Sequence, residues 1–342
     1  MNLSLDASAA PTMDVHLVAW IGLIAIVIAL ITVDIVGHVR TPHAPTLKEA
    51  GLWTAGYVTL AISFGFVVWA LWGLKFAGEY WAGWITEWSL SLDNLFVFVI
   101  IIAAFRVPRE YQQKVLLSGI IIALVLRFVF ILIGATLIEQ FSWIFYIFGL
   151  WLIWTAISQV REATNHNQHD EEYEEPLFVR FTRRFFPVTD GFLSDKLLHR
   201  HAGKTYLTPM LLVIIAVGSA DLMFAFDSIP AIFGLTNEPY LVFAANAFAL
   251  LGLRQLYFLI DGLLERLVYL HWGLAAILGF IGVKLILHAM HENNLSFVNG
   301  GQPFHVPEVG IPASLAFIVA TLTLTIVASI WKSNSVASKT AD

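Results

Sequence analysis

The sequence predicts an all-α polytopic membrane protein, and three observations support that prediction. Hydrophobic residues make up 58% of the 342 residues, charged residues only 13%, and the mean hydropathy is +0.76. Several apolar stretches run for about 18 residues or more, the length that a helix needs to cross a bilayer. Many of the twelve Trp and nine Tyr residues stand near the ends of these stretches, as in interfacial aromatic belts.

Nine segments are long and apolar enough to be spans, and we expect them to form one transmembrane transporter domain, residues 1–342. Residues 1–14 contain no Lys or Arg, so the first span lacks the basic flank of a cleavable signal and is expected to be retained. The nine predicted spans lie at about 15–36, 52–74, 87–105, 114–138, 143–160, 207–233, 241–260, 271–290 and 311–331.

The basic residues indicate the orientation of the chain. Of the 19 Lys and Arg residues, 15 fall in alternate connections between spans. By the positive-inside rule those connections are cytoplasmic, which places the N-terminus outside and the C-terminus in the cytoplasm. We expect a multi-pass protein of the plasma (inner) membrane. This arrangement requires an odd number of spans, which nine satisfies.

The longest connection, residues 161–206, is predicted to be a cytoplasmic loop. It opens with the acidic and histidine-rich "REATNHNQHDEEYEEP" and continues with the basic "VRFTRRFF". The first stretch is either a solvated linker, which we favour, or a metal sensor. The connection is too short and too polar to form a second domain with a core of its own.

Two spans carry acidic pairs in similar surroundings, "EWSLSLDNLFVFV" and "SADLMFAFDSIPA". In each stretch two acids stand six residues apart, and the following span contains an arginine. The offset between the two halves is 134 residues for the acids and 127 for the arginines, which one short indel reconciles. The residues concerned are Glu87, Asp93 and Arg127 in the first half and Asp221, Asp227 and Arg254 in the second.

The two halves are predicted to form an inverted repeat of three plus three helices, because the third span runs inward and the sixth runs outward. Repeat A covers about 87–160 and repeat B about 207–290. Inverted repeats with polar sites where they meet are typical of transporters. The alternative is a coincidence in an apolar sequence of low complexity.

Charged groups inside the membrane are expensive, so they are expected to face a shared interior. Asp34 lies near the inner end of the first span, and Lys284 lies in the outer half of its span. In one interpretation Arg127, Arg254 and Lys284 are charge partners in static salt bridges. In the other, which we favour because the acids outnumber the bases, the acids bind a cation that moves.

Helical geometry limits how such a site can be built. Six residues turn an α-helix by about 600°, which places Glu87 and Asp93 about 120° apart and about 9 Å apart along the axis. Either only one of them is a direct ligand, or the helix opens between them. Ser89 shares a face with Asp93, and Asn94 lies on the face of Glu87.

The second acidic pair is followed by a proline. Pro230 cannot donate a hydrogen bond to the carbonyl of Phe226, so a bent helix would free an oxygen beside Asp227. Ser228 follows Asp227 and offers a hydroxyl oxygen. Together with carbonyl, carboxylate and Asn oxygens it gives a set of hard ligands, which suits Mn²⁺, Mg²⁺ or Ca²⁺. The chain has no cysteine, which excludes thiolate sites. Asn246 either lines the interior that these acids are expected to share or forms a hydrogen bond between helices.

The blocks "EWSLSLDNLFVFVII", "ADLMFAFDSIPAIFGL" and "NAFALLGLRQLYFLI" resemble those of the TerC family, most closely its Alx-like manganese exporters. The resemblance covers about residues 15–331. It implies Mn²⁺ efflux and metal ligation by the acids of both blocks, here Glu87, Asp93, Asp221 and Asp227. Alx-like proteins often have a further acid where this chain has Gly218.

We therefore predict a secondary transporter that exports Mn²⁺. The residues expected to support the metal ligands are Asn94, Ser89, Ser228, Asn246 and Asp34. Mn²⁺ is the substrate, protons are the counter-ion, and no resident cofactor, catalytic residue or nucleic-acid partner is expected. The sequence contains no GxxxxGK[ST] motif, so the driving force must be a gradient. The alternatives are another divalent cation such as Ca²⁺, or a membrane scaffold that assists insertion or secretion.

Overall fold

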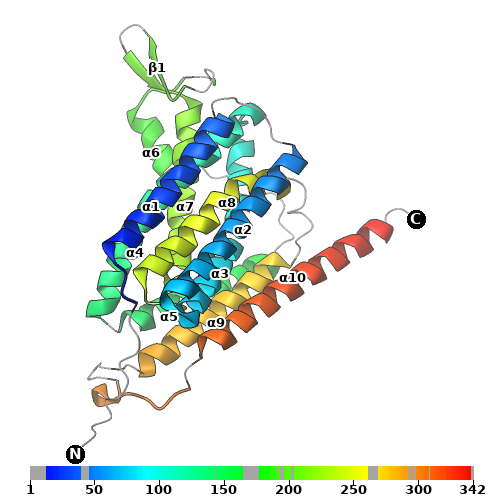
Figure 1. The fold of residues 1–342 in the computed structure, drawn as a ribbon. Helices are drawn as coiled ribbons and strands as arrows, with labels where there is room; N and C mark the ends of the chain where they lie inside the picture. The colour runs from blue at the N-terminus through cyan, green and yellow to red at the C-terminus, as the bar shows by residue number, and fades with distance from the viewer. Residues whose placement is uncertain are drawn as a thin grey trace, which may run out of the picture.

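The computed structural model shows a bundle of long helices with a small β-hairpin at one end, here called the hairpin end (Figure 1). It describes residues 13–39, 46–141, 143–164, 177–189, 191–192, 196–201, 204–260, 269–291, 293, 295, 298–307 and 309–339. The side chain of Asp93 lies outside that description, and so does the acidic and histidine-rich stretch 165–176.

Nine helices in the described part of the chain are long and apolar enough to cross a membrane, which confirms the predicted polytopic all-α fold. Thr46 caps one of them by accepting a hydrogen bond from the backbone N–H of Glu49 at 3.2 Å. The nine are α1 (Leu17–Asp34), α2 (Leu47–Trp72), α3 (Leu74–Ala104), α4 (Arg109–Gln140), α5 (Ile144–Thr164), α7 (Pro209–Phe233), α8 (Pro239–Ile260), α9 (Leu270–His291) and α10 (Ile311–Lys339).

The main departure from the predicted spans is the start of α3, which begins at Leu74 and not near residue 87. Only Gly73 separates α2 from α3, with a φ of 98° that favours glycine. Glu87 consequently stands in the middle of a 31-residue helix. No cluster of turn residues marks this point, so a single glycine makes a turn for which the sequence predicts a longer connection.

Helix α8 is the centre of the bundle. It packs against α2, α3 and α4. Of the apolar stretch with which α8 could span a membrane, 94% is buried inside the bundle, compared with 17% for α1. Helices α3 and α7 pack against each other, as do α4 and α7. Figure 1 shows α9 and α10 crossing obliquely beside this group, and α5 packs along α9.

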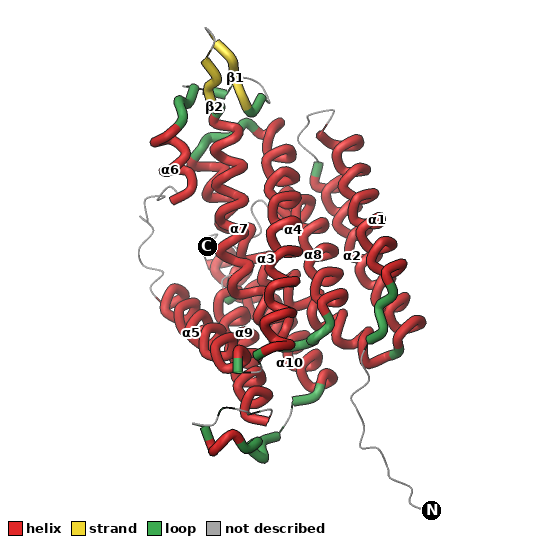
Figure 2. The backbone as a smooth tube through the Cα atoms, turned by 90° about the vertical axis from the view of Figure 1, so that its left-hand side faces the viewer, coloured by secondary structure: helices red, strands yellow, loops and turns green. Residues whose placement is uncertain are grey.

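The remaining elements are short. A π-helical turn (Ile35–Val39) follows α1, and a 3₁₀ turn covers Asn299–Gly301. At the hairpin end, α6 (Leu177–Phe185) packs against α7, and β1 (Leu198–His201) pairs antiparallel with β2 (Lys204–Leu207). Figure 2 shows α6 beside the first part of α7, with the hairpin beyond it.

Two glycines allow α5 and α9 to approach each other closely. A Cβ on Gly149 would lie 2.8 Å from the carbonyl oxygen of Gly282, and a Cβ on Gly282 would lie 2.8 Å from that of Gly149. Such distances are not found for real Cβ atoms, so either substitution would push the helices apart. Small residues at helix crossings are a common means of packing spans inside lipid.

We predict that Gly282→Ala destabilises the protein by about 1–3 kcal/mol, the usual cost of overpacking. The measurement is thermal unfolding of the purified protein in detergent. Gly56→Ala on α2 is the matched control, because its Cβ would meet nothing within 4 Å. Equal stability of the Gly282→Ala variant and the wild type would show that the crossing is looser than described.

Candidate functional site

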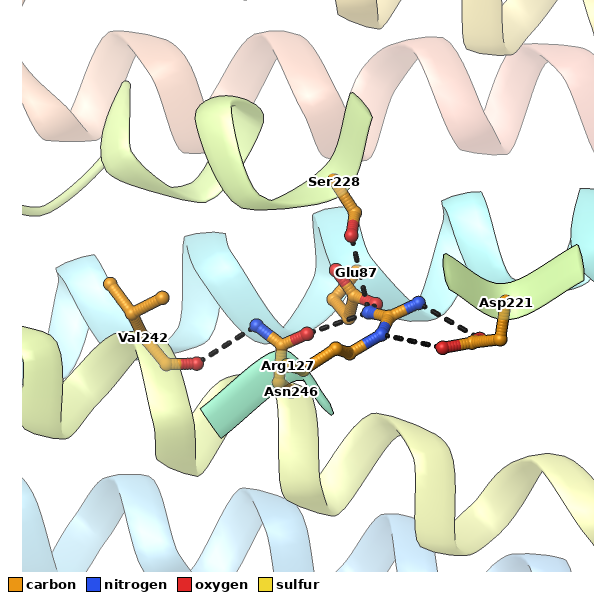
Figure 3. A network of polar contacts seen from close by, with 6 residues as sticks. All are labelled: Glu87, Arg127, Asp221, Ser228, Val242 and Asn246. Carbon is orange, nitrogen blue, oxygen red and sulfur yellow. Dashed lines mark hydrogen bonds and ion pairs between the residues drawn. The ribbon is translucent and has the colours of Figure 1, made fainter. Parts of the chain in front are cut away.

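The buried polar groups of the bundle meet on the side chain of Arg127, which is 0% exposed and lies between α3, α7 and α8 (Figure 3). Its Nε donates to Asp221 Oδ2 and one terminal nitrogen to Asp221 Oδ1, each at 3.1 Å. The other terminal nitrogen contacts Glu87 Oε1, Asn246 Oδ1 at 2.6 Å and Ser228 Oγ at 3.2 Å. We call these five residues the central network.

Charges in the central network do not balance. Glu87 and Asp221 are 0% and 2% exposed, and one guanidinium serves both carboxylates. Asp221 binds it with both oxygens, a bidentate geometry that is among the stronger ion pairs. Glu87 uses Oε1 only, and its Oε2 is buried with no hydrogen-bond partner among the described residues. If both acids are ionised, the network has one surplus negative charge.

Asn246 is held in place by its own helix. Its Nδ2 donates to the carbonyl oxygen of Val242 at 3.0 Å, which turns Oδ1 toward Arg127 (Figure 3). Asn246 thereby bonds between helices, since it links α8 to Arg127 of α4, the residue that also contacts Glu87 and Asp221. The amide adds an acceptor to the guanidinium without adding another charge.

Asp227 lies outside the central network and faces a cavity of about 510 Å³ that is lined by both polar and apolar side chains. Its Oδ1 accepts hydrogen bonds from Trp151 Nε1 at 2.7 Å and Thr155 Oγ1 at 3.0 Å, both on α5. Further polar residues line this cavity, which we call the Asp227 cavity; they are Asn94, Ser158, Gln159 and Ser228. Ser228 belongs to both places, so the cavity reaches the edge of the central network.

An apolar cavity of about 450 Å³ adjoins the Asp227 cavity between α4, α5 and α7. The two share Trp151 and Phe226, and the apolar one is lined further by residues such as Phe130, Ile133 and Pro230. Helix α7 continues through Pro230 to Phe233 without a break, and α3 is likewise continuous past Glu87. Neither helix opens between its two acids, so each pair remains spread along its helix.

The other charged residues of the spans lie elsewhere. Arg254 donates to Asp34 Oδ1 at 2.6 Å, a buried pair that joins α8 to the end of α1. Lys284 Nζ lies 3.2 Å from Ser314 Oγ on α10, and Ser89 donates to the carbonyl oxygen of Ile85. Among the predicted charge partners, therefore, Arg127 contacts acids of both halves, whereas Arg254 contacts an acid of α1.

Gly218 has a packing role on α7. A Cβ there would lie 3.2 Å from Ile122 Cγ2 of α4, so a larger side chain needs a local shift. Trp151 and Thr155, the donors to Asp227, were not predicted as site residues, since an indole and a hydroxyl four residues apart are ordinary in a span. Among the described residues, no three of His, Cys, Asp and Glu are grouped so as to hold a metal ion.

Comparisons with known proteins agree with the membrane architecture. A family model described as "Integral membrane protein TerC family" matches residues 72–337. The chain is 50% identical over 312 residues to "Uncharacterized membrane protein Rv2723" of Mycobacterium tuberculosis, which covers 91% of this chain and 79% of that protein. It is 36% identical over 323 residues to "Putative membrane-bound redox modulator Alx" of Escherichia coli, and the match covers 91% of this chain and 94% of that protein. No solved structure matches the chain.

We predict that Arg127→Gln destabilises the protein by about 3–5 kcal/mol, because it leaves two buried carboxylates without a cation. Chemical unfolding in detergent measures the loss. The double variant Arg127→Gln, Asp221→Asn should recover part of it, since one of the two charges is removed as well. Lys284→Gln serves as a control with the same change of charge outside the central network. A stable Arg127→Gln variant would contradict the charge balance described here.

Proposed function

The chain belongs to the TerC family of integral membrane proteins, and on that premise we propose that it is a secondary transporter that exports Mn²⁺ from the cytoplasm. The observation that supports this proposal is the surplus of buried carboxylates beside a cavity that contains a further carboxylate. Glu87 and Asp221 share one guanidinium, and Asp227 faces the cavity next to them. Intramembrane acids of this kind usually mark an ion pathway.

The ligands are proposed to come from oxygen-bearing side chains. Asp227, Asn94 and Ser228 line the cavity, and Glu87, Asp221 and Asp93 are the further acids of the two blocks. Carboxylate, amide and hydroxyl oxygens suit Mn²⁺, and the same set admits Ca²⁺. Competition between the two ions in a transport assay separates these substrates.

Arg127 occupies the two central carboxylates, so the metal and the guanidinium would compete for them. We propose that Mn²⁺ first enters the Asp227 cavity and reaches Glu87 and Asp221 only when Arg127 turns away. In the absence of metal the guanidinium offsets one of the two negative charges, which lowers the cost of an empty site. The protein then always has a cation at its centre, either its own or the substrate.

Proton antiport is the proposed driving force. Moving a divalent ion out against an inside-negative potential costs about 4.6 kcal/mol per 100 mV, which a gradient must supply. The surplus negative charge of the central network gives a place for a proton when no metal is bound. Carboxyls that are alternately protonated and metal-bound would couple the two flows.

Contacts between the two halves support the proposed inverted repeat. In the proposed repeat α3 corresponds to α7 and α4 corresponds to α8. The contact of α3 with α8 therefore has its counterpart in the contact of α7 with α4, and both contacts are present. At the α5–α9 crossing a Cβ on Gly149 would meet Ile286 at 2.7 Å, and a Cβ on Gly282 would meet Ile153 at 2.9 Å. Both pairs differ by 133 residues (282 − 149 and 286 − 153), close to the offset of the acids.

A membrane scaffold without transport is the second candidate. It is favoured by the full engagement of Arg127, which is what a static structural network would also show. The name of the Escherichia coli relative suggests redox modulation, but the 342 residues include no cysteine, so thiol chemistry cannot be carried by these residues. A scaffold would tolerate the loss of the Asp227 carboxylate, and a transporter would not.

We predict that Asp227→Asn lowers Mn²⁺ uptake into everted vesicles at least about tenfold, since a ligand to the ion is lost. Wild-type uptake should collapse when the pH gradient is dissipated. Glu110→Gln, an exposed carboxylate at the start of α4, is the control and should transport normally. If Asp227→Asn transports as well as the wild type while remaining folded, the site is wrong, and uptake that ignores the pH gradient would rule out antiport.

The proposed orientation, with the hairpin end in the cytoplasm, is testable because the chain has no native cysteine. Gln302 directly follows the 3₁₀ turn Asn299–Gly301, which lies at the end of the bundle opposite the hairpin that contains Arg200 (Figure 1). Gln302 and Arg200 are both exposed. We expect a membrane-impermeant thiol reagent to label Gln302→Cys in intact spheroplasts, and Arg200→Cys only after permeabilisation. The reverse pattern would show that the chain is inverted.

A further inference from the structure

The short helix α6 is not used by the proposed transport site. Its sequence, "LFVRFTRRF", combines three arginines with three phenylalanines in nine residues. Val179 is 0% exposed and faces the protein, since α6 packs against α7. Arg180 and Arg184 are exposed and stand four residues apart, on one face of the helix.

Apolar surface continues at the end of α6. Phe185 is 61% exposed and the following Phe186 is 54% exposed, which is unusual for aromatic side chains that face water. The helix thus has a buried contact with α7, two outward arginines and two outward aromatic rings. This combination is typical of helices that lie in the interface plane of a bilayer.

Helix α6 stands at the end of the bundle where α7 begins. It lies beside the first part of α7, whose span begins at Pro209 (Figure 2). Nine residues of helix are about 14 Å long, so α6 is too short to cross the bilayer. A helix of this length that packs against the beginning of a span is expected at the depth of the lipid headgroups.

We propose that α6 is a binding surface for anionic phospholipids. Arg180 and Arg184 pair with headgroup phosphates, and Phe185 and Phe186 enter the boundary between headgroups and acyl chains. Guanidinium groups match phosphate oxygens in a planar, bidentate geometry, and each basic residue near an anionic surface contributes about 1 kcal/mol. These lipids are expected in the cytoplasmic leaflet, and that placement alone rests on the orientation proposed above.

The experiment uses the full-length protein in detergent micelles, with phosphatidylglycerol or phosphatidylcholine added in steps. Thermal unfolding should shift upward with phosphatidylglycerol and much less with phosphatidylcholine, because only the first carries a net negative charge. The double variant Arg180→Gln, Arg184→Gln should bind phosphatidylglycerol about 30-fold more weakly, the effect of two charges. Added salt should weaken the wild-type response in the same direction.

Lys196→Gln, Arg200→Gln is the matched control, since it removes two exposed basic residues from the hairpin region at the same end. An equal loss in both double variants would show a response to net charge alone and would overturn the assignment to α6. A second variant, Phe185→Ser, Phe186→Ser, should weaken the response to phosphatidylglycerol while leaving its salt dependence unchanged. A wild-type response that does not distinguish the two lipids would also overturn it, whether or not the protein transports Mn²⁺.

Discussion

The bundle depends on one charge interaction, the contact of Arg127 with Glu87 and Asp221. Burying an ionised carboxylate costs free energy unless a cation and hydrogen-bond donors replace its water. Here a single side chain from α4 performs this for acids on α3 and α7 and also contacts α8. Because α3, α4, α7 and α8 all pack closely around this point, their spacing is tied to the geometry of one guanidinium.

The same interaction sets the conditions for the proposed transport. The Asp227 cavity already contains a carboxylate and neutral oxygen ligands, but a divalent ion there would be only partly neutralised. Further negative charge is carried by Glu87 and Asp221, which are paired with Arg127 on the other side of Ser228. A substrate ion therefore gains its full set of charges only when the central network rearranges. Binding and conformational change are coupled by charge balance, without a separate switch.

Hydropathy and charge were sufficient to predict nine spans and the unusual acids, because both are properties of single segments. The start of α3 was misplaced, since one Gly73 makes the turn that a connection of several residues was expected to make. The partners of the acids could not be predicted, because they depend on the lateral order of the helices. Arg254 contacts Asp34 only because α1 lies against α8, and Trp151 reaches Asp227 only because α5 lies beside α7.

The two arginines show how a repeated sequence can acquire unequal roles. Arg254 has one acid, Asp34, in a balanced pair, whereas Arg127 has two and leaves a surplus charge. In the proposed inverted repeat these arginines are equivalent, and the difference comes from α1, which lies outside the repeat and supplies Asp34. A balanced pair resists change, because breaking it exposes two charges to a low dielectric. In the proposed transport cycle a metal ion replaces the guanidinium at Glu87 and Asp221, so these carboxylates keep a cation when Arg127 turns away. Motion is therefore expected at Arg127, while Arg254 keeps α8 fixed to α1.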